Sequence, residues 1–198
     1  MSIDLIQLHY QEANQRANNQ AADRKTTQLA KQFFARSHQL QYSYNFSWLN
    51  RPIIQYPQDI VAFQELVSTV KPNLIIETGI AHGGSLVLSA SLLCLLDVME
   101  GLDPRQSPRK VVGVDIDILP HNRKALDEHP LRFKMELIEG SSIAPEIIQQ
   151  VRSYADGVDQ VLVSVGSYCI RSLLSLSSTH WIISQYSVSS YELQVQTS

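Results

Sequence analysis

The feature that most constrains the fold is an alternation of strand-like and helix-like segments through the middle of the chain. Four segments have the apolar, β-branched character of buried strands: 73–79 (NLIIETG), 111–118 (VVGVDIDI), 131–142 (LRFKMELIEGSS, with its exit turn) and 158–165 (VDQVLVSV). Between them lie three helix-like segments, at 85–99, 119–129 and 144–155. This alternation predicts a doubly wound, mostly parallel α/β sheet. The 198 residues are enough for one such domain with a substantial core.

The first 58 residues depart from this pattern and predict a helical and irregular leader. Residues 11–20 (QEANQRANNQ) are polar and suit a solvated helix or a loose leader, and an apolar stripe predicts a helix over about 26–40. The aromatic, proline-containing segment that follows predicts that the leader, 1–58, packs on the domain. Asp59 is a good helix N-cap, so we expect a helix and the cofactor-binding domain, 59–170, to begin there.

The C-terminal residues have another composition. Serine is abundant, and Arg171 and Glu192 are the only formally charged residues after residue 164. We expect an atypical tail over 171–198. Apolar residues alternate with polar ones through its second half, which suits an antiparallel hairpin over about 180–196.

Charge and cysteine content exclude several classes of partner. A net charge of −3 gives no reason to expect binding to nucleic acid or to an anionic membrane. Cys94 and Cys169 lie in apolar runs, which predicts buried free thiols in a reducing compartment. The N-terminus lacks a basic segment followed by an apolar one, and no apolar run approaches the roughly 20 residues of a transmembrane segment. We therefore expect a cytoplasmic protein.

The most informative motif is IIETGIAHGGS, residues 75–85. An acid, Glu77, ends a strand, and a glycine-containing turn then opens a helix at Gly83-Gly84-Ser85. Such a turn lets a ligand approach the backbone beside unpaired N–H groups. The dinucleotide fingerprint G-x-G-x-x-G is absent, and a carboxylate here would repel a pyrophosphate. Glu77 would instead suit the cationic amino-acid end of S-adenosylmethionine (SAM), so we favour a methyl donor over NAD.

Polar residues at the ends of the next two strands support a nucleotide site. Asp115 and Asp117 are spaced to point to one face of the second strand. A carboxylate at that position can accept hydrogen bonds from both hydroxyls of a ribose, in SAM or in NAD. The third strand leaves through EGSS, residues 139–142, near the expected position of an adenine ring.

Several of these residues have a second interpretation. Glu77 could be a surface acid that caps a helix. His82 is either a catalytic residue or a polar residue of the turn, and the glycine-rich context favours the turn. Trp48 and Tyr56 either line a substrate pocket or pack the leader on the sheet. Cys94 fits the helix core.

The stretch from about residue 48 to 163 resembles the cephalosporin hydroxylase / rhamnosyl O-methyltransferase family. The similarity is carried by RPIIQYPQD, QELVSTVKPNLIIETGIAHGGSLVLSASLL, VVGVDIDI, HNRKALDEHP and LIEGSS, in that order. It implies a Rossmann-like, class I methyltransferase fold and SAM-dependent O-methylation of a sugar or natural-product hydroxyl, as in lipid or glycan biosynthesis. The resemblance implies a methyl-donor site at Glu77, Gly79, Gly83, Gly84, Ser85, Asp115 and Ser141, to which we add Asp117 as a candidate. It places Asp59 near the substrate pocket, and Tyr56 is a second substrate candidate.

The resemblance ends abruptly near the fourth strand. The family continues with an L-D-S-x-H-T word, a helix, a strand and an E-D pair, and these acids supply a site for a divalent metal such as magnesium. Here SVGSYCI, residues 164–170, is similar to the entry of the next strand, and no E-D pair follows. At Val163–Ser164 the sequence passes directly from the start of the fourth strand to the entry of the next one. This favours an internal deletion followed by a frameshift, although a degenerate paralogue and a new edge hairpin also fit.

These observations predict an O-methyltransferase-like protein that binds SAM weakly or not at all and is catalytically impaired. Its catalytic residues stay unassigned, and its metal ligands are predicted to be missing. The expected partner is a small-molecule or glycan substrate, and a homo-oligomer is compatible with the sequence. A non-catalytic remnant of the same fold is the main alternative, and an NAD-dependent enzyme is a weaker one.

Overall fold

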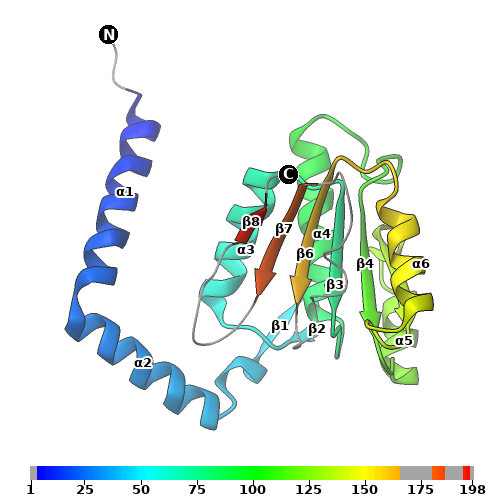
Figure 1. Cartoon of the computed structure of the whole chain (residues 1–198), viewed down its shortest axis with the longest axis horizontal. Coiled ribbons are helices and arrows are strands. Elements are labelled where there is room, and N and C mark those ends of the chain that lie inside the picture. The colour runs from blue at the N-terminus through cyan, green and yellow to red at the C-terminus, as the bar shows by residue number, and fades with distance from the viewer. Residues whose placement is uncertain (1–3, 166–179, 186–193, 197–198) are drawn as a thin grey trace. The chain divides into compact units, whose positions relative to one another are not determined.

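The computed structural model describes residues 4–165, 180–185 and 194–196 of the chain (Figure 1). It divides the chain into two compact units, Met1–Tyr42 and Ser43–Ser198. The predicted boundaries of the leader at residue 58 and of the cofactor-binding domain at residue 170 stay predictions. Among the described residues, no helix is both long and apolar enough to cross a bilayer.

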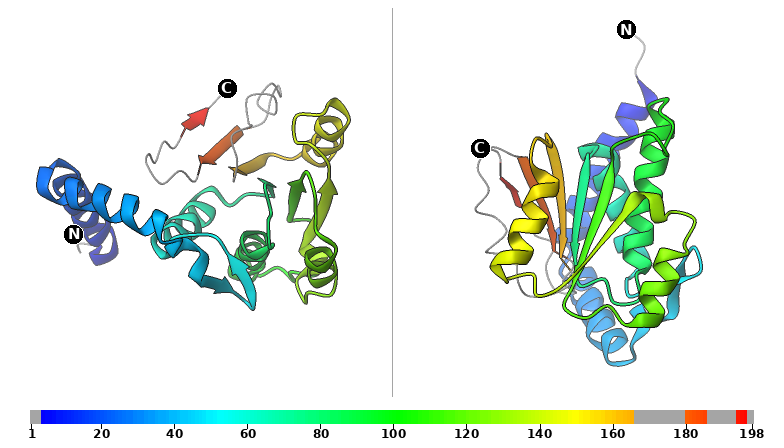
Figure 2. Two further views of the ribbon diagram at one scale, coloured as in Figure 1. Left: turned by 90° about the horizontal axis from the view of Figure 1, so that it is seen from below. Right: turned by 90° about the vertical axis from the view of Figure 1, so that its right-hand side faces the viewer.

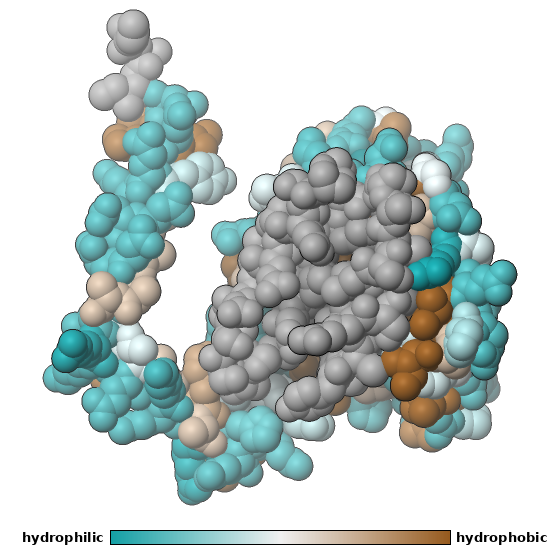
Figure 3. Space-filling model, in the orientation of Figure 1, coloured by the Kyte–Doolittle hydropathy of each residue, from teal (hydrophilic) through white to brown (hydrophobic). Residues whose placement is uncertain are grey.

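The first unit consists of two helices, α1 (Leu5–Ala22) and α2 (Arg24–Gln39). Each begins at an aspartate whose carboxylate accepts hydrogen bonds from backbone amides of the first turn, Asp4 for α1 and Asp23 for α2. The face of both helices that is visible in Figure 3 is mostly hydrophilic. The helices predicted for this region are therefore confirmed.

The second unit is built on a six-stranded sheet in the order β5-β4-β3-β6-β7-β8, in which only β8 is antiparallel. The strands are β3 (Leu74–Thr78), β4 (Lys110–Asp115), β5 (Met135–Glu139), β6 (Gln160–Val165), β7 (His180–Gln185) and β8 (Gln194–Gln196). The helices are α3 (Pro57–Val70), α4 (Gly84–Met99), α5 (Pro120–Asp127) and α6 (Pro145–Ala155), with a short 3-10 turn, η2 (Arg132–Lys134), before β5. The predicted Rossmann-like parallel sheet is confirmed.

Two apolar clusters fill the two faces of the sheet. Neighbouring residues of β3 belong to different clusters: Ile75 packs with side chains of α3, α4 and α5, whereas Ile76 packs with side chains of α6. Figure 2 shows the same division, with α6 on one side of the sheet and α4 and α5 on the other. Since alternate residues share a face, Glu77 points to the same side as Ile75, toward α4.

The segment that precedes α3 is more regular than predicted. A 3-10 turn, η1 (Tyr42–Asn45), leads into an antiparallel hairpin of β1 (Phe46–Trp48) and β2 (Arg51–Ile53). The helix α3 then begins at Pro57, with Tyr56 as its N-cap residue, and Asp59 lies within the first turn. The prediction that Asp59 caps this helix is wrong, because proline at the first helical position favours an earlier start.

The end of one strand also differs from the prediction. The strand predicted over 111–118 ends at Asp115, so Asp117 lies beyond it and the two acids do not share a strand face. The fourth strand, predicted over 158–165, is confirmed as β6, which continues to Val165 beside Thr78 of β3. The predicted antiparallel pairing near the C-terminus is confirmed between β7 and β8. Of the proposed entry strand, 164–170, the first two residues belong to β6, and residues 166–170 lie outside the described residues.

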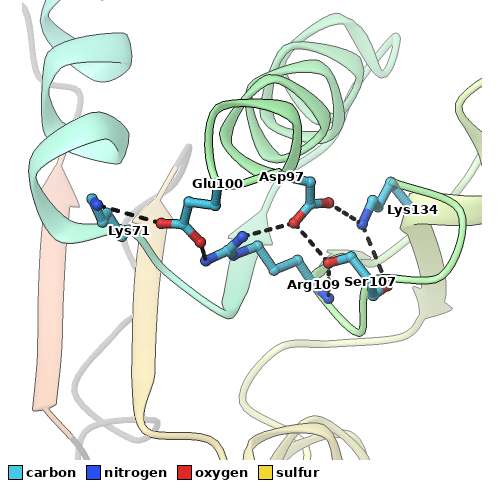
Figure 4. Close-up of polar contacts among 6 residues, drawn as sticks. All are labelled: Lys71, Asp97, Glu100, Ser107, Arg109 and Lys134. Carbon is cyan, nitrogen blue, oxygen red and sulfur yellow. Dashed lines mark hydrogen bonds and ion pairs between the residues drawn. The ribbon is translucent and has the colours of Figure 1, made fainter. Parts of the chain in front are cut away.

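A buried ionic cluster fastens the C-terminal end of α4 to the sheet (Figure 4). The Asp97 carboxylate is fully buried and receives Lys134 Nζ at 2.6 Å, Arg109 Nη1 at 2.7 Å and Ser107 Oγ at 2.7 Å. Arg109 also contacts Glu100 at 2.6 Å. Burial opposes ionisation of Asp97, but its three hydrogen-bond donors outweigh burial and lower its pKa. The cluster therefore holds an ionised Asp97 and sets the position of α4 along the sheet.

Candidate functional site

A cavity of about 360 Å³ lies at the carboxyl ends of β3, β4 and β6, beside the start of α4. We name it the main cavity because most of the predicted cofactor residues line it, not because of its volume. Ligands of open α/β sheets bind at this edge of the sheet. Five predicted residues line it: Glu77, Gly79, Gly84, Ser85 and Asp115. The other lining residues are Tyr44, Pro52, Ile54, Gln55, Ile80, Ala81, His82 and Ser164.

Glu77 is the buried acid of the cavity, with an exposed fraction of 3%. Its carboxylate accepts a short hydrogen bond from Ser85 Oγ and a long one, 3.5 Å, from Ser89 Oγ, both on α4. Burial raises the pKa of Glu77 from its ordinary value of 4.5 to about 7, although the two hydroxyl donors lower it. No cation from the described residues pairs with it. A cationic ligand group would supply the missing countercharge.

The turn from β3 to α4 has an unusual backbone conformation. Gly79, Ala81 and Gly83 have φ angles of 80°, 44° and 82°, in the left-handed region that glycine tolerates and alanine does not favour. One oxygen of Asp115, Oδ2, accepts the amides of Ile80 at 2.9 Å and Ala81 at 3.1 Å. Asp115 therefore supports the turn, a role that the sequence did not predict for it.

The second oxygen of Asp115 is less engaged. Oδ1 receives only the Asp117 amide at 3.4 Å among the described residues, beyond the usual length of an N–H···O hydrogen bond. Asp115 also lines the cavity. One carboxylate can thus hold the turn with one oxygen and present the other oxygen to a ligand hydroxyl.

The remaining predicted residues do not line this cavity. Asp117 lines a second cavity of about 550 Å³ beside α5 and the end of β5, and Ser141 lines neither of these two cavities. Asp59 and Glu77 share a small adjoining pocket. Tyr56 is 3% exposed, and Gly83 is the N-cap of α4.

Three polar lining residues were missed by sequence reasoning. Ser164 lies next to Glu77 in the β3–β6 register, and only the strand pairing reveals this neighbour. Tyr44 and Gln55 come from the segments on either side of the β1–β2 hairpin, which reach the cavity through long-range packing. No local motif marks any of them.

The described residues contain no group of three or more His, Cys, Asp or Glu side chains placed to hold a metal ion. The residues that follow Ile170, where the resemblance places the E-D pair of metal ligands, lie largely outside the described ranges. The prediction about missing metal ligands stays a prediction.

Comparison with known proteins relates this site to a protein family. Residues 40–173 match the family model "Rhamnosyl O-methyltransferase/CmcI". A curated relative, the rhamnosyl O-methyltransferase of Mycobacterium leprae (strain TN), is 28% identical over 106 residues, which are 54% of this chain and 40% of the relative. The chain therefore spans less than half the length of that relative.

Solved structures of CmcI are similar at lower identity. The one with Mg and SAM is 15% identical, with a TM-score of 0.47, over 71% of this chain and 57% of that chain. An apo structure of CmcI is 17% identical, with a TM-score of 0.46, over the same shares. The family match itself covers more than half of this chain and includes every residue that lines the main cavity. The chain belongs to the rhamnosyl O-methyltransferase/CmcI family.

Proposed function

We propose that the main cavity binds S-adenosylmethionine, in place of the sequence-based prediction of weak or absent binding. We also propose that the chain derives from an O-methyltransferase whose acceptor is a hydroxyl of a sugar or other natural product. One observation carries this proposal. Glu77 is buried beside a glycine turn at the carboxyl edge of a parallel sheet, and no cationic side chain in the described part of the chain forms an ion pair with it. The curated rhamnosyl O-methyltransferase and the CmcI structure with Mg and SAM support it at the level of the family.

The residues of the cavity fit the chemical groups of this ligand. The buried Glu77 carboxylate would accept hydrogen bonds from the ligand ammonium, and Asp115 Oδ1 would accept one from a ribose hydroxyl. The cofactor supplies an electrophilic methyl group on a sulfonium sulfur. The chain itself binds and orients this group, and its buried wall at Ile80 and Ser164 limits the access of water.

Glu77 also argues against a dinucleotide. The turn lacks G-x-G-x-x-G, and Glu77 would place a carboxylate against a pyrophosphate that carries two negative charges, whereas an acid at the position of Asp115 suits the ribose of either cofactor. We expect no measurable binding of NAD or NADH under conditions in which S-adenosylhomocysteine (SAH) binds.

We further propose that methyl transfer is impaired in this chain. The support is in the sequence, because the family's Asp-Ser-x-His-Thr word and E-D pair are not found after Val163. Without these carboxylates, a divalent metal cannot lower the pKa of the acceptor hydroxyl in the way the family uses. Magnesium-dependent turnover on a sugar acceptor would contradict this proposal.

Titration calorimetry with SAH tests the cofactor proposal. Wild-type protein is compared with Glu77→Ala and Asp115→Ala, and with Glu146→Ala on the exposed start of α6 as a matched control. Binding that both site variants lose and the control keeps supports the cofactor site. Absence of binding to the wild-type protein supports the second candidate, a non-catalytic remnant of the same fold.

The nucleotide sequence that encodes residues 160–198 provides a separate test of the C-terminal end. Read in all three frames, it is expected to contain an E-D word outside the translated frame if a frameshift produced the serine-rich tail. Absence of such a word in every frame favours a degenerate paralogue, which the serine-rich composition of the tail also fits.

A further inference from the structure

The turn between β3 and α4 carries backbone carbonyls that neither the sheet nor α4 uses. The carbonyl oxygens of Ala81 and His82 belong to this turn, and Ala81 has a φ of 44°. A non-glycine residue in this region persists only where the surroundings hold it. Because the turn forms one wall of the main cavity, whatever holds it also determines the shape of that wall.

Arg51 reaches the turn from outside the Rossmann-like core. It lies at the start of β2, and its guanidinium donates to the His82 carbonyl through Nε at 2.9 Å and through Nη2. The same Nη2 donates to Asn122 Oδ1 at 2.9 Å. The planar fork of arginine can satisfy both acceptors at once, and the single ammonium of lysine cannot reproduce this geometry.

Asn122 completes the contact from the other side. It is 3% exposed in the first turn of α5, and its Nδ2 donates to the Ala81 carbonyl at 3.2 Å. The amide oxygen of Asn122 therefore accepts from Arg51, and the amide nitrogen donates to the turn. Together with Asp115, which accepts the Ile80 and Ala81 amides, these side chains hold the turn through both its donors and its acceptors.

The hairpin that carries Arg51 is itself fixed against the start of α4. A side-chain carbon at Gly84 would lie 2.2 Å from the carbonyl oxygen of Pro52, so β2 and the first turn of α4 meet backbone to backbone. Arg51 is therefore presented from a rigid support. The hairpin precedes the alternating strands and helices in sequence, but it belongs structurally to the cavity.

We infer that Arg51 and Asn122 are positioning residues, which hold the 79–84 turn in its ligand-binding conformation before a ligand arrives. The inference rests on the proposed cofactor function and deepens it, since it assigns the β1–β2 hairpin to the cofactor site. A preorganised turn lowers the conformational cost of binding, so the contact contributes to affinity without touching the ligand.

The first measurement is amide hydrogen exchange of the full-length chain without ligand. In Arg51→Lys the amides of residues 80–83 are expected to exchange about tenfold faster, because charge-assisted hydrogen bonds to the turn are lost. Asn122→Asp keeps an acceptor for Arg51 and replaces the donor to Ala81 with a carboxylate oxygen, so it removes the second contact and retains the first. Amides of β3 and β4 serve as internal references and are expected to remain unchanged.

The second measurement is SAH affinity by calorimetry, with Arg132→Lys as the matched control. Arg132 also donates to a backbone carbonyl, that of Met135, and to a side-chain oxygen, that of Asp127, but it lines neither the 360 Å³ cavity nor the 550 Å³ cavity. We expect the Kd for SAH to rise about tenfold in Arg51→Lys and to stay within twofold in the control. Arg51→Lys retains the positive charge, so a loss of affinity reports geometry rather than charge.

The outcomes separate this inference from the proposed function. Faster exchange of the turn together with weaker SAH binding supports the positioning role. Unchanged exchange, or faster exchange with unchanged affinity, overturns it while the cofactor proposal stands. Failure of the wild-type protein to bind SAH overturns the cofactor proposal. It then also overturns the positioning role of Arg51 and Asn122 in cofactor binding.

Discussion

At the scale of single residues, Glu77 shows how burial changes what a motif means. The sequence identifies an acid at the end of a strand, but its protonation depends on its surroundings. The structure places it 3% exposed beneath Ser85 and Ser89, and burial raises its pKa to about 7. Near neutral pH a large fraction of this carboxyl is therefore protonated in the free protein, and a cationic ligand would draw it to the ionised form.

This raised pKa predicts a pH-dependent effect of Glu77→Gln on stability. Between pH 4.5 and 7 the folded state keeps the Glu77 proton and the unfolded state releases it, so wild-type stability falls as pH rises. At pH 8 the cost to the wild type is roughly 3 kcal/mol. Urea unfolding at pH 4 and pH 8 is expected to show the variant gaining relative stability at the higher pH. Glu146→Gln, on the exposed start of α6, is the control.

The same shift predicts the pH dependence of ligand binding. If the ligand ammonium requires an ionised Glu77, SAH affinity rises about tenfold per pH unit up to pH 7 and then levels off. Calorimetry in buffers of different ionisation enthalpy is expected to detect one proton released on binding at pH 6. An affinity that stays constant from pH 5.5 to 7.5 would show that Glu77 is not the partner of the ammonium.

At the scale of the elements, α4 is held at its two ends by different interactions, close backbone packing at one end and buried ion pairs at the other. Its N-terminal end meets the hairpin at Gly84, where the backbones are in close contact. Its C-terminal end is held by the Asp97 cluster, in which a fully buried carboxylate faces Lys134, itself 1% exposed. The cluster lies far along the helix from the cavity, so we assign it to stability and to the position of α4.

Asp97→Asn is expected to destabilise the protein strongly. It leaves the buried Lys134 and Arg109 charges without their shared carboxylate, and breaking a buried pair in this way typically costs about 3–5 kcal/mol. Urea unfolding measures the loss. Lys124→Met is the control, because the Lys124–Glu128 pair is exposed and we expect a change below about 1 kcal/mol. A loss of similar size in both variants would contradict the role of burial.

At the scale of the whole molecule, the cavity belongs to one of the two compact units. Its lining residues run from Tyr44 to Ser164, all within the unit Ser43–Ser198. The helices α1 and α2 form the other unit. The predicted leader of residues 1–58 therefore contains two different parts. The β1–β2 hairpin lines the cavity, and the helices α1 and α2 precede it.

Removal of residues 1–42 distinguishes these parts. A chain that begins at Ser43 is expected to unfold cooperatively and to bind SAH within about twofold of the full-length protein, since every lining residue remains. Circular dichroism and calorimetry provide the measurements. A large loss of stability would instead support the original prediction that the helical leader packs on the domain.

Much of the fold follows from local sequence, and part of the site does not. The alternation of strands and helices, the glycine turn and the acids Glu77 and Asp115 are visible as patterns within short windows. Ser164 and Arg51 become part of the site only through contacts distant in sequence, one through strand register and one through hairpin packing. Sequence periodicity carries no information about such contacts, because they depend on how separate elements pack.

The sequence by itself therefore determined the class of sheet, the position of the turn and the family of the chain. Only the tertiary structure decided that Asp115 supports the turn, that Asp117 lies beyond the strand, and that Glu77 has a pKa of about 7. The reason is physical: backbone periodicity is a local property of the chain, whereas burial, charge compensation and hydrogen-bond partners arise only when distant segments come together.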